Sequence, residues 1–204
     1  MPHRAGSIVV PGDPGRGQAL TEFVLVVPIM LLLLLGIADF GRLFAAGIVV
    51  RAAARDGAEA AAQLYVQLDH TTSMSATDFY AALHDKAAGV ACDEAKALWN
   101  TTTDGSGNCT VPAIAVCVHD AGLTVNGVTQ PGDTCGGTQG PATADESANC
   151  SGLGQAWTTA PDAAGLPSVE VRVCYPFTLM LQTQILPIGP VYLQETSRFV
   201  AATY

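Results

Sequence analysis

The fold of this chain is decided by the stretch GQALTEFVLVVPIMLLLLLGIADFGRLFAAGIVV, residues 17–50. Its central block, residues 23–38, has sixteen residues without a charge, and the apolar character resumes after Asp39 and Arg42. A helix through both blocks is long enough to cross the apolar core of a bilayer, which is about 30 Å thick. We therefore expect one transmembrane segment at about residues 23–45.

The same helix is expected to continue beyond the membrane. Residues 48–68, IVVRAAARDGAEAAAQLYVQL, are rich in Ala and other strong helix formers. This predicts one helix over residues 18–68, bent at Pro28, because proline removes a backbone donor and a membrane helix tolerates the resulting kink. No AxA-like site follows the apolar block promptly, which argues against a secretory signal peptide. Residues 1–17, rich in Gly and Pro, are expected to form a cytoplasmic leader.

Charge divides the chain into two regions. Up to Arg55 there are five Arg and three acidic residues, whereas from Asp56 onward there are four basic and fifteen acidic residues. The composition is 49% hydrophobic and 13% charged, and the apolar excess lies in the first 65 residues. The anionic distal part would repel a phosphate backbone, so we expect no nucleic-acid partner.

The cysteines all lie beyond the apolar stretch. Six of them in one region indicate an oxidising compartment, and we expect three disulfides, with a mixture of free thiols as the alternative. Six cysteines allow fifteen pairings, among which the sequence does not choose. No CxxC spacing supports a zinc or thioredoxin-type site. The candidates are Cys92, Cys109, Cys117, Cys135, Cys150 and Cys174.

The region from residue 69 to 204 predicts a small extracytoplasmic α+β domain. A second helix is expected over residues 77–98, and two core strands, IAVCV (114–118) and VEVRV (169–173), are expected to be neighbours. Between them, residues 119–168 form an irregular Gly- and Thr-rich insert, which Cys135 and Cys150 are expected to staple. A last strand is expected over residues 191–201, and the three prolines at 176, 187 and 190 favour loop or edge structure before it. The fold class is thus a long N-terminal helix followed by a disulfide-stapled domain with a short antiparallel sheet.

Glu22 stands five residues after Gly17, at the very start of the apolar helix. An ionised carboxylate near lipid is costly, so this position needs an explanation. One interpretation places Glu22 at headgroup level, where the positive end of the helix dipole favours an acid. The other makes it a functional group of the helix.

The stretch Gly17 to Phe23, GQALTEF, resembles the type IV prepilin processing site. More closely, residues 16–58 resemble the TadE-like pseudopilins of tight-adherence (Flp) pilus systems, and the final segment from VEVRVCYPF onward is similar to the end of such proteins. The residues that carry this resemblance, besides the run of leucines, are Arg16, Gly17, Gln18, Glu22, Phe23, Pro28, Gly36, Asp39, Gly41, Arg42, Arg51, Arg55 and Gly57. The six cysteines and the long insert depart from the family pattern.

The resemblance implies that a prepilin peptidase cleaves between Gly17 and Gln18 on the cytoplasmic side and that Glu22 becomes the fifth residue of the mature chain. It also implies a minor pilin that contributes to pilus biogenesis, adhesion or export, with membrane lipid, other pilin subunits and the pilus assembly machinery as partners. In assembly, the mature amine of one subunit would neutralise Glu22 of its neighbour and select the axial register.

The sequence also indicates the orientation of the chain in the cytoplasmic membrane. Arg4 and Arg16 precede the span and favour a cytoplasmic N-terminus, with the domain outside the cytoplasm or on a surface pilus. Arg42, Arg51 and Arg55 follow the span and oppose this rule, so the cysteines carry part of the argument.

Other residue types with catalytic or metal-binding potential form no pattern. His70, His84 and His119 are scattered and are expected to be exposed to solvent, and Asp104, Asp133 and Asp145 lack an EF-hand arrangement and are expected to be solvated. We recognise no GxSxG, HExxH, Walker or GxGxxG motif, and we expect no enzyme, metal or cofactor. The alternative function is an unprocessed single-pass anchor that displays an extracytoplasmic ligand-binding domain.

Overall fold

The computed structural model describes residues 15–69, 74–122, 165–180 and 189–201, together with short pieces between residues 124 and 161. Side chains in the first helix are described from residue 20 to residue 68. The helices are α1 (Gly15–Asp69) and α2 (Ala76–Ala95). The strands are β1 (Thr102–Thr103), β2 (Cys109–Val111), β3 (Ala113–His119), β4 (Thr124–Val125), β5 (Val128–Thr129), β6 (Gly137–Gln139), β7 (Ser168–Phe177) and β8 (Val191–Val200).

The chain divides into two units, residues 1–40 and residues 41–204, and α1 contributes to both. The second unit, called the domain below, contains the later part of α1, the helix α2 and all the strands.

Helix α2 begins at a well-formed cap. The hydroxyl of Ser75 accepts a hydrogen bond from the backbone N–H of Asp78 at 3.2 Å, as expected for serine at an N-cap. The helix ends three residues before the predicted position, because the next residues form a turn in which the N–H of Leu98 donates to the carbonyl of Ala95 at 2.9 Å. Its buried face carries Phe79, Leu83 and a row of alanines.

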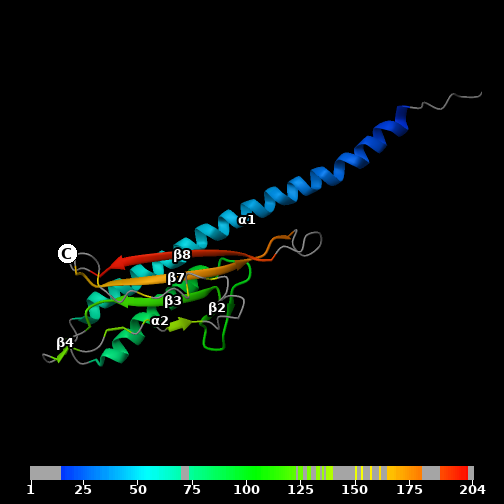
Figure 1. Ribbon diagram of the computed structural model, residues 1–204. Coiled ribbons are helices and arrows are strands. Elements are labelled where there is room, and N and C mark those ends of the chain that lie inside the picture. Colours follow the sequence, from blue (N-terminus) through cyan, green and yellow to red (C-terminus); the bar gives the residue numbers. More distant parts are fainter. Residues whose placement is uncertain are drawn as a thin grey trace, which may run out of the picture. The chain divides into compact units, whose positions relative to one another are not determined.

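The central sheet has the strand order β6-β3-β7-β8, and every neighbouring pair is antiparallel. Strands β3, β7 and β8 lie side by side in Figure 1. The alternation in VEVRV turns Val169, Val171 and Val173 to one face of β7 and Glu170 and Arg172 to the other. The predicted pairing of residues 114–118 with 169–173 is confirmed, since Val116 lies opposite Val171.

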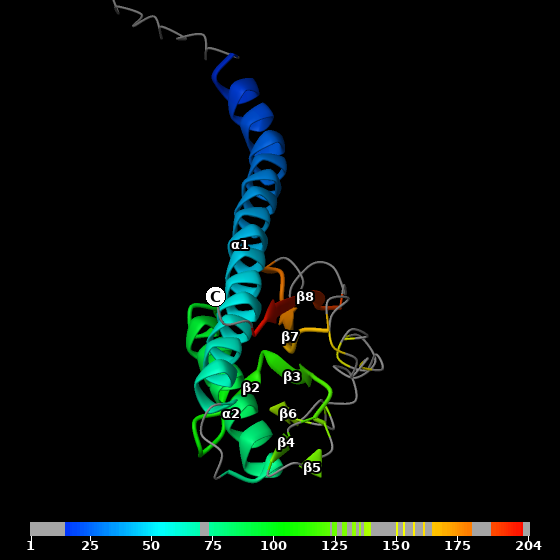
Figure 2. The same cartoon turned by 90° about the vertical axis from the view of Figure 1, so that its left-hand side faces the viewer.

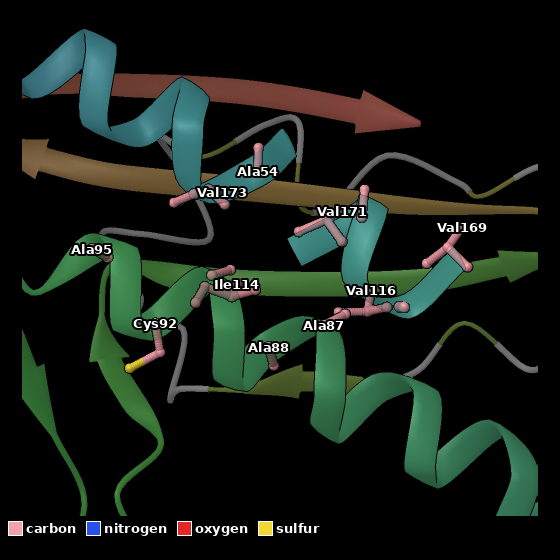
Figure 3. Close-up of a cluster of buried hydrophobic side chains, with 14 of the residues drawn as sticks. Ala54, Ala87, Ala88, Cys92, Ala95, Ile114, Val116, Val169, Val171 and Val173 are labelled. Carbon is pink, nitrogen blue, oxygen red and sulfur yellow. The ribbon is translucent and has the colours of Figure 1, made fainter. Parts of the chain in front are cut away.

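Both helices of the domain pack on one face of this sheet (Figure 2). Figure 3 shows side chains from α1, α2, β3 and β7 meeting in one cluster, for example Ala54, Ala87, Val116 and Val171. The two helices approach closely at Gly57, where an added Cβ would lie 2.7 Å from the carbonyl oxygen of Ala87. Small residues on both helices therefore determine how near they pack.

Three disulfides stabilise the domain. Cys92–Cys109 joins α2 to β2, Cys117–Cys135 ties the segment after β3 to that strand, and Cys150–Cys174 ties residue 150 to β7. Cys135 and Cys150 do staple the segment between the core strands, each to a different strand of the sheet. The α+β fold class with a long N-terminal helix, an antiparallel sheet and disulfides is confirmed.

Of two expectations for the end of the chain, the structure confirms the last strand and places one proline differently. The predicted last strand is present as β8, which is paired with β7 along its length. Pro176, expected in a loop or at an edge, lies inside β7 opposite Tyr192. Its missing N–H is tolerated there because the pairing of β7 with β3 has already ended at Cys174.

Within residues 119–168, the structure describes three short strands, and much of that range lies outside the described residues. The same holds for the leader, of which the structure describes only the residues from Gly15 onward.

Candidate functional site: the N-terminal apolar helix

The first unit presents an apolar helix surface on every side. In α1 the exposed fractions of Phe23, Leu25, Leu33 and Ile37 are 68%, 73%, 63% and 70%. Between residues 20 and 40 the large apolar side chains that are exposed are Leu20, Phe23, Val24, Leu25, Val26, Ile29, Met30, Leu31, Leu32, Leu33, Leu34, Leu35, Ile37 and Phe40. A helix that is apolar all round requires an apolar environment, because water around such a surface costs free energy.

The length of this helix matches a bilayer. Residues 20–40 rise by about 30 Å in an α-helix, which equals the thickness of the hydrocarbon core. In the described part of the chain, α1 is the one helix long and apolar enough to cross a membrane. Its apolar window is almost entirely exposed, unlike that of a core helix in a soluble protein.

The sequence-predicted processing and assembly residues lie at the start of this helix. The backbones of Gly17 and Gln18 are helical, and their surroundings lie outside the described side chains. Glu22 is exposed, and no hydrogen bond or ion pair reaches its carboxylate from any residue that the structure describes. It is followed directly by exposed Phe23. A carboxylate in this position is available to another molecule.

Residues 17–59 match the family model of the TadE-like proteins. This TadE-like segment contains Gly17, Glu22, the whole apolar block and the first turns of α1 in the domain. The sequence resemblance is therefore confirmed over the segment. No curated protein and no solved structure matches the chain. The TadE-like match and the exposed apolar helix together fit a membrane protein associated with tight-adherence pili.

Asp39 differs from Glu22 although both carboxylates lie in the TadE-like segment. The exposed fraction of Asp39 is only 3%, whereas Glu22 is exposed. The match includes both residues, and the structure separates them by environment: Glu22 is presented outward, and Asp39 is enclosed.

The histidines of the domain correct the expectation that they are exposed to solvent. His119 is fully buried, and its Nε2 lies 2.9 Å from a carboxylate oxygen of Glu170. The other oxygen of Glu170 accepts a hydrogen bond from Arg172 at 2.8 Å, and the Arg172 guanidinium lies 3.7 Å from the ring centroid of Trp157. Burial of a charged group requires such partners. These residues form a polar layer on the face of the sheet opposite the helices.

His84 and Asp133 form a second polar contact, and the solvated position expected for Asp133 is wrong. His84 on α2 lies 2.7 Å from Asp133, which is 6% exposed and also accepts hydrogen bonds from the N–H groups of Val118 and Cys135. Burial opposes ionisation of Asp133, but these hydrogen bonds outweigh it and lower its pKa below the ordinary value. The contact attaches residue 133 to α2 and β3.

The pKa of Asp120 is shifted in the opposite direction to that of Asp133. Burial raises its pKa, although Tyr80, Gly122 and Tyr65 all donate hydrogen bonds to its carboxylate. Burial and the neighbouring Asp120 carboxylate also raise the pKa of Tyr80 well above the ordinary range. Tyr65 on α1 and Tyr80 on α2 therefore meet at one acceptor, which links both helices to the end of β3.

One cluster of acidic and sulfur-bearing side chains in the domain resembles a metal site but is not one. Cys117, Asp133 and Cys135 lie close enough to share an ion. However, the two sulfurs are bonded to each other, so neither offers the thiolate that a metal requires. His70 and Asp145 lie outside the described residues.

Sequence reasoning missed the polar layer of His119, Glu170 and Arg172. The alternation in VEVRV did indicate that Glu170 and Arg172 share a face. It gave no sign that this face is covered, because the covering residue Trp157 comes from the irregular insert.

Proposed function

We propose that this chain is a minor pilin (pseudopilin) of a tight-adherence pilus, with a structural and not a catalytic role. The observation that carries the proposal is the outward-facing Glu22 at the head of an exposed apolar helix within the TadE-like match. A helix that served only as a tether would need no carboxylate there, because an acid at the edge of a span adds a desolvation cost.

Processing would create the partner for this carboxylate. Cleavage by a prepilin peptidase between Gly17 and Gln18 would leave Gln18 with a free amine at the start of the helix. In a packed bundle that amine would neutralise Glu22 of the neighbouring subunit, and pairing would offset the cost of removing both charges from water. A misaligned subunit would leave Glu22 unpaired, so the pair also selects the axial register.

The proposed orientation places the domain outside the cytoplasm. Its three disulfides need an oxidising compartment to form and persist. Arg4 and Arg16 lie on the other side of the apolar block, where basic residues are retained in the cytoplasm. In this orientation Gly17 faces the compartment in which prepilin peptidases cut.

The test replaces Glu22 in cells that carry the complete pilus system. Glu22→Ala and Glu22→Gln are each expected to remain in the membrane fraction but to disappear from sheared pili, because neither offers a negative charge. Thr21→Ala, one residue earlier on the same helix, is the matched control and is expected to assemble. Quantitative immunoblots of the membrane and pilus fractions give the result. Assembly of Glu22→Ala at the level of Thr21→Ala would refute the role of Glu22.

A further inference from the structure

The four most exposed large apolar side chains in the described part of the domain come from three segments: the first turns of its α1 portion, the turn after α2 and the residues after β7. At the first turns of its α1 portion, Phe44 and Ile48 are 64% and 70% exposed. Trp99, in the turn after α2, is 82% exposed, and Met180, three residues after the end of β7, is 51% exposed. At the opposite end of β7, the large apolar side chains are less exposed, with Leu166 at 41% and Val200 at 42%.

Contacts confirm that these segments meet. Arg42 lies with its guanidinium 5.8 Å from the ring centroid of Trp99 and 5.4 Å from that of Phe177. A surface pocket lined by Arg42, Val49, Leu98, Trp99, Tyr175 and Phe177 lies between them. We call Arg42, Trp99 and Phe177 the aromatic cluster. It combines a highly exposed indole with a cation and an apolar hollow.

One member of this cluster, Arg42, directly follows the apolar segment in the sequence. Arg42 follows residue 40, the end of the exposed apolar surface, by two residues, and α1 continues through this point without interruption. Arg42 therefore lies about 3 Å beyond that end along the helix axis, given the rise per residue. If the hydrocarbon core ends near residue 40, Arg42 falls within the headgroup layer, which adds about 5–7 Å on each side of the core.

Tryptophan and arginine are well suited to this layer. Trp is enriched at membrane interfaces because its ring is apolar while its N–H can bond to water or to a headgroup. A guanidinium within 6 Å of two aromatic ring centroids keeps its positive charge beside an apolar surface, and a guanidinium can bind a lipid phosphate. The exposed acids Asp93 and Glu94 and the cation Lys96, just before Trp99, balance the local charge, so zwitterionic headgroups suit this surface better than strongly anionic ones.

We propose that the aromatic cluster is an interfacial anchor that inserts Trp99 into the headgroup layer of the bilayer that α1 crosses. The anchor would fix the height of the domain above the membrane before the subunit leaves it for a pilus. The inference rests on the membrane insertion of α1 that the proposed function requires, and it adds a lipid contact to the domain itself.

The chain contains two tryptophans, which makes a direct test possible. The full chain is reconstituted into phosphatidylcholine vesicles, some of which contain phosphatidylcholine brominated on the acyl chain close to the glycerol. Bromine quenches only tryptophans that reach its depth. In Trp157→Phe, where Trp99 is the single tryptophan, fluorescence is expected to fall with brominated lipid, and to fall less when the bromine lies near the acyl end.

The matched control is Trp99→Phe, which keeps Trp157 against Arg172 in the polar layer and is expected to show no quenching. If Trp157→Phe disturbs folding, the difference between the unaltered chain and Trp99→Phe gives the same information. Flotation of the vesicles is measured in parallel. Flotation without quenching of Trp99 would overturn the anchor and leave membrane insertion standing, and would favour a protein partner for the aromatic cluster. Failure of the chain to float would contradict the membrane insertion on which both proposals rest.

Discussion

The two parts of helix α1 differ in their residues and in their surroundings. Between residues 20 and 40, bulky Leu, Ile and Phe side chains are exposed on every side. Between residues 41 and 68, the buried positions are mostly small, such as Ala53, Ala54 and Ala58 against α2 and the sheet. Bulky residues suit contact with lipid, whereas alanine allows a second helix to come close. The second part also carries five charged residues where the first carries two, so both side-chain size and charge distinguish the two parts.

Reduction of the disulfides should reveal the largest difference between the domain and the membrane-spanning residues 20–40. Each bridge is expected to contribute about 2–4 kcal/mol to the free energy of unfolding. All six cysteines lie in the domain, so loss of three bridges should unfold it while residues 20–40 of α1 remain in the membrane. Circular dichroism and vesicle flotation with and without dithiothreitol measure the two effects. Release of the chain from vesicles on reduction would show that the parts are not independent.

Shortening one leucine in the domain and one in residues 20–40 of α1 should change the stability of the domain by unequal amounts. Leu83 is fully buried in the domain, and Leu83→Ala is expected to cost about 2–5 kcal/mol of stability because it leaves a cavity. Leu33 is 63% exposed, and Leu33→Ala should leave the stability of the domain unchanged. Urea unfolding of the full chain in detergent, followed by tryptophan fluorescence, compares them. Equal losses would contradict the division between the two parts.

Adding a methyl group to a glycine should test the close approach of the helices. A Cβ at Gly57 would lie 2.7 Å from the Ala87 carbonyl oxygen and 3.0 Å from the Ala91 Cβ, so Gly57→Ala is expected to cost about 1–3 kcal/mol. Gly89 on α2 has open space around it, and Gly89→Ala is expected to stabilise the domain by about 0.5–1 kcal/mol through helix propensity. Thermal unfolding of both variants gives the comparison, and a stabilising Gly57→Ala would refute the tight crossing.

The two buried aspartates should respond to pH with opposite signs. The pKa of Asp133 is lowered by its hydrogen bonds, so its contribution to stability is present above the ordinary Asp pKa and is lost as the pH falls through the lower, folded-state value. The pKa of Asp120 is raised by burial, so its contribution is present at low pH and is lost as the pH rises through the folded-state value.

Asp133→Asn is therefore expected to cost about 1 kcal/mol at pH 7 and less near pH 3, since it removes an accepted hydrogen bond. For Asp120→Asn the loss should be smaller at pH 7 than near pH 3. Unfolding free energies of both variants and the unaltered chain at pH 3, 5 and 7 measure the trends. Parallel trends for the two substitutions would contradict the assigned pKa shifts.

The sequence was sufficient to predict the structural features that depend on a local pattern of residues. An uninterrupted apolar block predicts a helix surface that needs lipid, and the alternation of VEVRV predicts a strand with one apolar face. The pairing of β3 with β7 followed, because two apolar strands in one small domain have few other partners.

The polar contacts of the domain were not predictable in this way. His119 and Glu170 are 51 residues apart, and His84 and Asp133 are 49 apart, so only the folded chain brings them together. Asp133 and Trp157 belong to the irregular insert, where no periodicity indicates burial. The disulfide pairs were equally undetermined, since cysteine spacing does not specify which strands will be neighbours.

The central claim is that α1 is the assembly helix of a processed pilin and not a simple tether. Mass spectrometry of the native N-terminus, on protein purified from membranes of cells with an active prepilin peptidase, tests it most directly. We predict that the chain begins at Gln18, with Glu22 as its fifth residue. A chain that retains Gly17 and the residues before it, in cells that process their other pilins, would contradict the claim and favour an unprocessed anchor for the domain.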